Sequence, residues 1–188
     1  MNFTTLKDIA DRYIETLILP SDPNRPRWNR ENFIFRKPPK WNYIDSCMIS
    51  ALIGMYDFCG DDRLLRYADS FMRAYVCEDG RIPSMRAEDY NLDNLCGGRV
   101  LMNLHRITGD ERYRLAYERL WKEQVLAQPR LSCGSFFHKA MYPYQLWLDG
   151  VYMALPFMTE YGVMTNVKII FFKYKFLLKN IIYISTKK

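Results

Sequence analysis

The amino-acid sequence predicts an all-α protein, in which helical hairpins are arranged around an axis as an α/α toroid. Two observations carry this prediction. The segments Gly60-Asp61-Asp62-Arg63 and Gly109-Asp110-Glu111-Arg112 are the same signal, repeated 49 residues apart. Each signal separates a helix that is apolar on most sides from a helix with one charged face. A helix that is apolar on most sides is buried, whereas an amphipathic helix has one face exposed to solvent. Their alternation along the chain therefore predicts inner helices enclosed by outer ones.

The repeated signal reads as a tight turn between two helices. Gly60 and Gly109 suit the left-handed position that ends a helix, because glycine lacks the Cβ atom that disfavours it. The aspartates that follow, Asp61 and Asp110, suit the N-cap of the next helix.

The remaining helices follow from the same alternation and make three hairpins. We expect outer helices at about residues 3–18, 62–77 and 110–126, and inner helices at about 43–58, 92–107 and 147–161.

Long loops at 20–41, 78–90 and 128–143 all precede inner helices, so they should gather at one end of the toroid, where function is expected. An ordinary helical solenoid is the alternative, but it needs no acidic residue in a fixed place. Here acids recur at the starts of inner helices, at Asp45, Asp93 and Asp149.

Composition excludes several classes of protein. Hydrophobic residues make up 49% of the 188 residues, which argues against disorder. The net charge of +6 comes from six lysines after residue 162, so the 21 other basic residues balance the 21 acidic ones and no nucleic-acid partner is expected. The segment 1–162 is therefore interpreted as the folded domain, and 163–188 as an aberrant tail.

The tail is rich in Lys, Ile and Phe and contains no Gly, Pro, Asp or Glu. We interpret it as translation that runs out of frame through AT-rich DNA; a basic helix on a membrane surface is the alternative. Its lysines interrupt the apolar run too often for a membrane span.

The amino terminus shows no signal-peptide pattern, so a cytoplasmic location is expected. Five cysteines, none in a CxxC pair, predict free buried thiols in a reducing compartment rather than a zinc site or a disulfide framework.

Chemistry is expected among residues at or just before the starts of the inner helices, since no Gly-rich phosphate loop, GxSxG elbow or HExxH motif is present. These candidates are Trp41, Tyr43, Asp93, His138, Lys139, Trp147 and Asp149. Two carboxylates among aromatic rings suit a glycosidase, because the rings stack on sugars and an apolar setting raises one carboxyl pKa so that it donates a proton.

Each candidate also has a purely structural interpretation. The three aspartates could be N-caps, which is the interpretation we favour for Asp45. Trp41 and Trp147 could be core aromatics, and His138 and Lys139 ordinary loop residues. Asp149 lies between large apolar residues and before a glycine, a setting that a surface cap does not need.

The segment FFHKAMYPYQLWLDGVYMALPF, residues 136–157, resembles the signature of the unsaturated rhamnogalacturonyl hydrolases, glycoside hydrolase family 105, which are related to the family 88 unsaturated glucuronyl hydrolases. WNYID and NLDN-x-x-GG match that family upstream, and the resemblance covers about residues 1–162. It implies an (α/α)6 barrel, of which this chain supplies about three of six hairpins.

The resemblance also implies a function. The substrate would be a short pectin-derived oligosaccharide with a 4,5-unsaturated galacturonic acid at its non-reducing end, and the reaction would be hydration of the vinyl ether without a metal or other cofactor. Asp149 would be the proton donor and Asp93 the second catalytic carboxylate. The substrate-binding residues would be Tyr43, Trp41, His138, Lys139 and Trp147.

Two other function classes stay open at this point. One is a glycan-binding or inert fragment, because half a ring leaves an open cleft and lacks contacts to the substrate. The other is a sugar epimerase on the same toroid. An epimerase would need catalytic histidines on inner helices, and the sequence offers only His105 there. We also expect self-association through apolar helix faces that a complete ring would cover.

Overall fold

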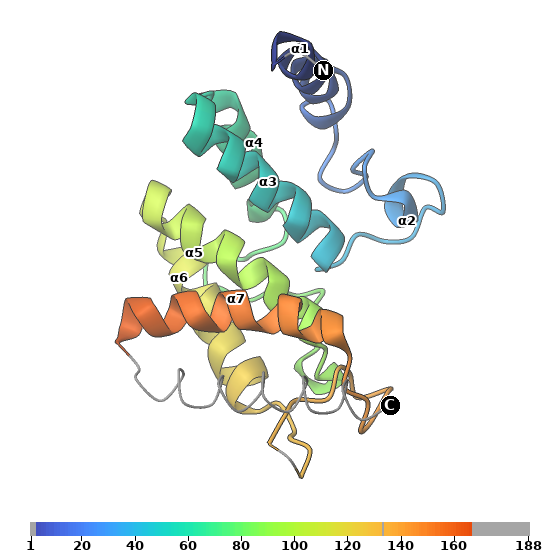
Figure 1. The fold of residues 1–188 in the computed structure, drawn as a ribbon, viewed down its shortest axis with the longest axis vertical. Helices are drawn as coiled ribbons and strands as arrows, with labels where there is room; N and C mark the ends of the chain where they lie inside the picture. The colour runs from blue at the N-terminus through green and yellow to red at the C-terminus, as the bar shows by residue number, and fades with distance from the viewer. Residues whose placement is uncertain (1–2, 133, 167–188) are drawn as a thin grey trace.

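The computed structural model describes residues 3–132 and 134–166, and within these ranges every regular element is helical (Figure 1). The prediction of an all-α fold is confirmed. The longer elements are α1 (Phe3–Tyr13), α3 (Tyr43–Cys59), α4 (Asp62–Arg73), α5 (Cys96–Thr108), α6 (Glu111–Leu120) and α7 (Leu148–Thr165). The shorter ones are α2 (Arg30–Phe33), π-helical turns η1 (Ile14–Ile18) and η4 (Trp121–Leu126), and 3₁₀ turns η2 (Ala87–Asp89) and η3 (Leu92–Leu95).

The helices form two layers, as the alternation of helix types predicts. The inner helices α3, α5 and α7 lie in a row, with α5 in contact with both neighbours (Figure 1). The outer helix α4 packs against α3, and the outer helix α6 packs against α5. The core between the layers contains fully buried side chains from both, including Leu64, Leu101, Tyr113 and Phe157.

Both predicted Gly-Asp turns are present. Gly60 and Gly109 have φ angles of 70° and 71°, the left-handed conformation that favours glycine. The side chains of Asp61 and Asp110 accept hydrogen bonds from the backbone N–H groups two residues on, and so cap α4 and α6.

The helix bounds differ from the sequence-based ones at three places. The outer helix predicted over 62–77 ends at Arg73, and the inner helix predicted to begin at 92 starts with the 3₁₀ turn η3 before α5. The third inner helix continues to Thr165, three residues into the segment interpreted as a tail. The interpretation of the remaining tail falls on 167–188, outside the described residues.

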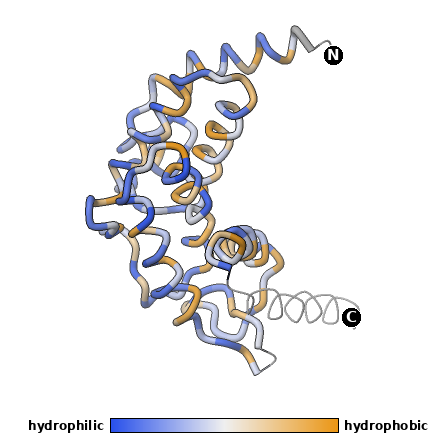
Figure 2. The backbone as a smooth tube through the Cα atoms, turned by 90° about the vertical axis from the view of Figure 1, so that its left-hand side faces the viewer, coloured by the Kyte–Doolittle hydropathy of each residue, from blue (hydrophilic) through white to orange (hydrophobic). Residues whose placement is uncertain are grey.

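The amino-terminal helix was predicted to be an outer helix, but it makes less contact with the rest of the protein than that prediction implies. Only its end is buried, at Ile14 and Ile18, whereas Leu6, Ile9 and Tyr13 are about half exposed. Figure 2 shows hydrophobic and hydrophilic residues alternating along α1, which extends away from the body. The apolar stripe therefore formed as predicted, but along most of α1 it is not covered.

The inner helices also keep an uncovered face. On α3, exposed residues recur at helical spacing, at Tyr43, Cys47, Ala51, Gly54 and Phe58.

Within the described ranges no helix combines the length and apolar character that a membrane span requires.

The long loops gather at one end, where they bond to one another. The backbone N–H of Trp41 donates to Ser84 Oγ at 2.9 Å, which joins the first loop to the second. The N–H of Ala140 donates to the carbonyl of Asp89, also at 2.9 Å, which joins the second to the third. This end of the toroid is therefore a single structured surface.

Asp45 is not an N-cap, contrary to our interpretation of the sequence. Asn42 caps α3 by accepting a hydrogen bond from the Asp45 backbone N–H. The buried Asp45 carboxylate instead accepts from Trp28 Nε1, Asn29 Nδ2 and Asn42 Nδ2 at 2.9, 3.1 and 2.7 Å. Burial raises its pKa, against the effect of these hydrogen bonds. Asp45 thus anchors the first long loop to α3.

Replacing Asp45 with alanine should lower the free energy of unfolding by on the order of 3 kcal/mol, because three donors lose their buried acceptor. Urea unfolding followed by circular dichroism measures this change. Asp57→Ala on the same helix is the matched control, since that side chain is half exposed and its ion pair with Arg106 spans 4.0 Å. Equal stability of the two variants would contradict the anchoring role.

Candidate active site

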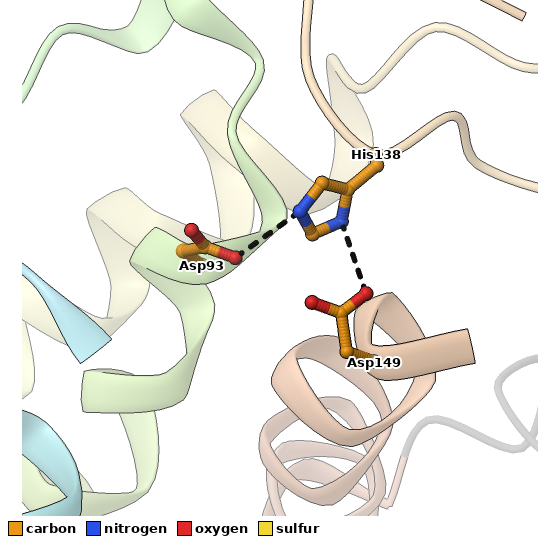
Figure 3. A group of neighbouring side chains, drawn as sticks. All are labelled: Asp93, His138 and Asp149. Atoms are coloured by element: carbon orange, nitrogen blue, oxygen red, sulfur yellow. Dashed lines mark ion pairs between the residues drawn. The ribbon is translucent and has the colours of Figure 1, made fainter. Parts of the chain in front are cut away.

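Three side chains from separate elements converge where the loops meet the inner helices (Figure 3). Asp93 comes from η3, His138 from the third long loop, and Asp149 from the first turn of α7. The ring of His138 lies between the two carboxylates. Its Nε2 is 3.4 Å from Asp93 Oδ1, and its Nδ1 is 3.9 Å from Asp149 Oδ1.

Asp93 is a buried carboxylate with a cationic partner. Asn91 caps η3 by accepting a hydrogen bond from the Asp93 backbone N–H, so Asp93 itself is not the cap. Its carboxylate accepts from Lys139 Nζ at 2.6 Å through Oδ2, while Oδ1 faces His138. Lys139 is therefore positioned to compensate the charge of Asp93 in the absence of substrate.

His138 is only 1% exposed and is fixed from both sides of its backbone. Its carbonyl accepts from Leu92 N–H at 3.1 Å, and its N–H donates to the carbonyl of Gln145 at 3.0 Å. Gly150 makes room for the ring, because a Cβ there would lie 3.1 Å from Nδ1. The sequence Leu-Asp-Gly thus places Asp149 and the space for His138 on the same helical turn.

Burial favours the neutral form of the His138 imidazole. Removal from water lowers its pKa, while Asp93 and Asp149 oppose that shift. Within the described residues Nδ1 is buried and has no hydrogen-bond partner, and the nearest carboxylate oxygen belongs to Asp149. A small movement of the half-exposed Asp149 side chain would complete a hydrogen bond to it.

Asp149 differs from Asp93 in its access to solvent. Its side chain is 50% exposed, against 11% for that of Asp93. The N-cap of α7 is Trp147, and its side chain makes no capping hydrogen bond. Of the two carboxylates, Asp149 is therefore the one that an incoming substrate can reach directly.

A polar pocket of about 220 Å³ adjoins Asp93 and Lys139. Tyr43 and Trp41 also line it, so four of the predicted site residues share one cavity. Tyr43 stays 40% exposed. Trp41 is only 6% exposed, and its indole N–H donates to the Asn94 carbonyl at 2.9 Å. Its ring therefore forms part of the pocket wall and leaves little open face on which a sugar ring could stack.

The position of Trp41 depends on Gly97, where a Cβ would come within 2.2 Å of the indole ring. The glycines of NLDN-x-x-GG therefore allow α5 to pack closely against Trp41.

Trp147 completes the set of predicted residues. It lines a smaller apolar pocket together with His138, and the two rings stack at 4.6 Å with an angle of 9° between their planes. Tyr142 stacks on Trp147 at 5.1 Å, and Gln145 accepts a hydrogen bond from the indole N–H. The sequence interpretation missed both of these residues, although each lies in the segment whose resemblance it used.

Comparisons with known proteins agree with the fold. A solved structure of a glycoside hydrolase from family 105 of C. acetobutylicum ATCC 824 is similar with a TM-score of 0.74 and 28% sequence identity. The similarity covers 91% of this chain and 42% of that chain. The model of Glycosyl Hydrolase Family 88 matches residues 22–181. The chain belongs to glycosyl hydrolase family 88.

Family membership confirms the glycoside hydrolase relationship and the α/α toroid that the sequence predicted. The family match runs to residue 181, past the boundary at 162 where we expected the resemblance to end. The chain spans 42% of the length of the solved relative.

The donor atoms of this candidate site are also of the kind that hold a cation. One atom each from Asp93, His138 and Asp149 lie within 4.8 Å of one another, and two oxygens with one nitrogen suit a divalent ion. Lys139 already pairs with Asp93 at 2.6 Å, however, and its positive charge disfavours a cation there. The arrangement therefore fits a hydrogen-bonded group of side chains better than a metal centre.

His105, the candidate that an epimerase would require, lies elsewhere. It is in the last turn of α5, at the opposite end of that helix from Asp93, and its Nε2 is 3.3 Å from Glu111. It shares no contact with the group of Asp93, His138 and Asp149.

Proposed function

We propose that this chain carries the acid/base half of a hydrolase that removes 4,5-unsaturated galacturonic acid from the non-reducing end of short pectin-derived oligosaccharides. The supporting observation is the pair of carboxylates, one buried and one exposed, on either side of a buried histidine. Environments that differ in this way let two carboxylates take different roles in one reaction.

In the proposed reaction Asp149 donates a proton to C4 of the alkene, and a water molecule adds at C5. The water gives its second proton to the Asp149 carboxylate, which restores the acid. The product is a hemiketal at C5, whose ring opens to a ketone. The hemiacetal left at C1 then releases the remaining oligosaccharide as an alcohol. The net change is the addition of one water molecule, and Asp149 leaves the reaction as it entered.

The other residues would bind and orient the sugar. Lys139 lines the polar pocket and donates to Asp93, so it is positioned to pair with a uronate carboxylate that enters the pocket. Asp93 would accept hydrogen bonds from sugar hydroxyls, and Tyr43 and Trp147 would contact the faces or edges of the unsaturated ring. His138 would hold the two carboxylates apart at a fixed separation.

Unsaturated and saturated digalacturonides test this proposal directly. Loss of the ultraviolet absorbance of the alkene measures hydration, and calorimetric titration measures binding of either sugar. In a relative of full family length that carries the same segment, hydration of the unsaturated sugar but not of the saturated one supports the proposed function. Equal binding of both sugars without hydration would instead favour a glycan-binding module, a role consistent with the exposure of Asp149 and of the inner face of α3.

We further propose that the 188-residue chain associates with itself through the uncovered apolar residues of the inner helices. Phe58 is 82% exposed, and Leu148 and Tyr152 are 73% and 63% exposed. Burying about 300 Å² of apolar surface would contribute on the order of 7 kcal/mol before the entropic cost of association. The Asp149 side chain is half exposed, so a substrate would be held loosely at the proton donor, and we expect little hydrolysis from this chain alone.

Sedimentation velocity checks the association. We expect the average mass to rise with concentration, and a variant that combines Phe58→Lys with Tyr152→Lys to sediment as a monomer. Tyr144→Lys is the matched control, because Tyr144 is 83% exposed but lies in a loop instead of on the inner helices. A monodisperse monomer with ordinary turnover of the unsaturated sugar would contradict both expectations.

A further inference from the structure

Two cysteines lie side by side on the inner wall, outside the group of side chains that the proposed reaction uses. Cys47 is in the second turn of α3 and Cys96 is the first residue of α5, and their sulfur atoms are 3.8 Å apart. Both line a hollow of about 250 Å³ between α3, α5 and α7. The sequence predicted buried thiols, but Cys47 is exposed and Cys96 is partly exposed.

The repeat explains why these two residues meet. Cys47 and Cys96 are 49 residues apart, the same separation as Gly60 and Gly109. Each cysteine therefore occupies the same position in its own hairpin. Equivalent positions on neighbouring inner helices face one another, so the contact follows from the backbone arrangement and not from a chance side-chain conformation.

We propose that Cys47 and Cys96 form a dithiol modification site, which a low-molecular-weight disulfide converts into an intramolecular disulfide joining α3 to α5. A disulfide bond is about 2.05 Å long, so the sulfur atoms must approach by about 1.8 Å. Both side chains line the hollow between the inner helices, so neither sulfur is enclosed in the core between the helix layers. The proposal does not depend on the hydrolase function.

The surroundings assign different roles to the two thiols. Cys47 is exposed, whereas Cys96 is only partly exposed. The hydrogen-bond contact with Cys96 also lowers the pKa of Cys47 to about 7, which favours the Cys47 thiolate. The same interaction, together with burial, raises the pKa of Cys96. Cys47 is therefore the thiol that attacks first, and Cys96 is the thiol that resolves the intermediate.

The exchange has two steps. The Cys47 thiolate attacks one sulfur of oxidised glutathione, forms a mixed disulfide and releases one glutathione thiolate. Cys96 then loses its proton and attacks the Cys47 sulfur, which forms the protein disulfide and releases the second glutathione. The protein loses two hydrogens and the oxidant is reduced to two thiols.

The product would connect this site to the candidate active site. Cys96 comes three residues after Asp93, directly at the end of η3. A bond to Cys47 would fix that junction against α3, whose first residue is Tyr43. Oxidation would therefore change the wall of the polar pocket without consuming a residue of the proposed reaction.

Peptide mapping after treatment with oxidised glutathione tests the proposal. Trypsin leaves Cys47 and Cys59 in one peptide, between Lys40 and Arg63, so the experiment uses the Cys59→Ser chain, which alters an exposed thiol. We expect a cross-linked pair of peptides that contain Cys47 and Cys96 and weigh two hydrogens less than their sum. Cys77 should remain free for alkylation. A glutathione adduct that persists on Cys47, or a cross-link to another cysteine, would overturn the proposal.

A variant and a chemical probe make the test independent of any single result. In Cys96→Ser the resolving thiol is absent, so glutathione should remain attached to Cys47. Phenylarsine oxide, which bridges two adjacent thiols, should protect Cys47 and Cys96 together from alkylation in a chain that carries no change at either position. Alkylation of both thiols at the unprotected rate would overturn the proposed site even if Cys96→Ser fails to fold.

Discussion

Replacing Asp149 with asparagine should lower the rate of alkene hydration by about 10²–10⁴-fold, the range that a general acid contributes. Asparagine keeps the shape of the side chain but neither donates a proton of suitable acidity nor accepts one from water. Half of the Asp149 side chain is exposed, so the variant should fold as the parent does. The ultraviolet assay, in this chain or in a relative of full family length that carries the same segment, measures the effect.

The control for this variant is Glu160→Gln on the same helix. Glu160 pairs with Arg99 at 2.9 Å, eleven residues beyond Asp149, so its loss removes an acidic group from α7 without touching the candidate site. We expect its turnover to stay within about twofold of the parent, since an exposed pair contributes little. Near-normal turnover in Asp149→Asn would remove Asp149 from the acid/base role.

The fold was predictable from the sequence because its signals are local. Glycine at a left-handed position followed by a capping aspartate ends one helix and starts the next, and Gly60 and Gly109 both have that conformation. The separation of α1 from the body was not predictable in this way. Its apolar stripe marks it as a packing helix, but no local signal states which surface covers Leu6 and Ile9.

The sequence predicted which residues belong to the candidate site, but not how their side chains are arranged. Asp93, His138 and Asp149 were all among the candidates, yet the position of the imidazole between the carboxylates depends on backbone bonds from His138 to Leu92 and Gln145. Such contacts between loops leave no periodic pattern in a sequence. The burial of Trp41 likewise depends on the missing Cβ of Gly97, 56 residues away.

Removing either charge of the Asp93–Lys139 pair should destabilise the fold, whereas removing both should cost less than the sum. Asp93→Asn leaves the Lys139 cation without a counter-charge in a position where its side chain is only 22% exposed. Lys139→Met leaves the more deeply buried Asp93 carboxylate with only His138 beside it, whose burial disfavours the charged form. Breaking a buried ion pair lowers the free energy of unfolding by about 3–5 kcal/mol. Because Lys139 is partly exposed, we expect each single substitution to lower it by about 2 kcal/mol.

A double-mutant cycle separates this coupling from the other effects of each substitution. Unfolding in urea of the parent, the two single variants and the double variant should give a coupling free energy of about 1–3 kcal/mol. Arg86 and Asp89 are the matched control, because they form an ion pair of 3.9 Å with both side chains mostly exposed. Their cycle should give less than about 0.5 kcal/mol. Equal coupling in the two cycles would mean that Lys139 does not hold Asp93 in place, and that the lysine is free to meet a substrate carboxylate without first leaving another partner.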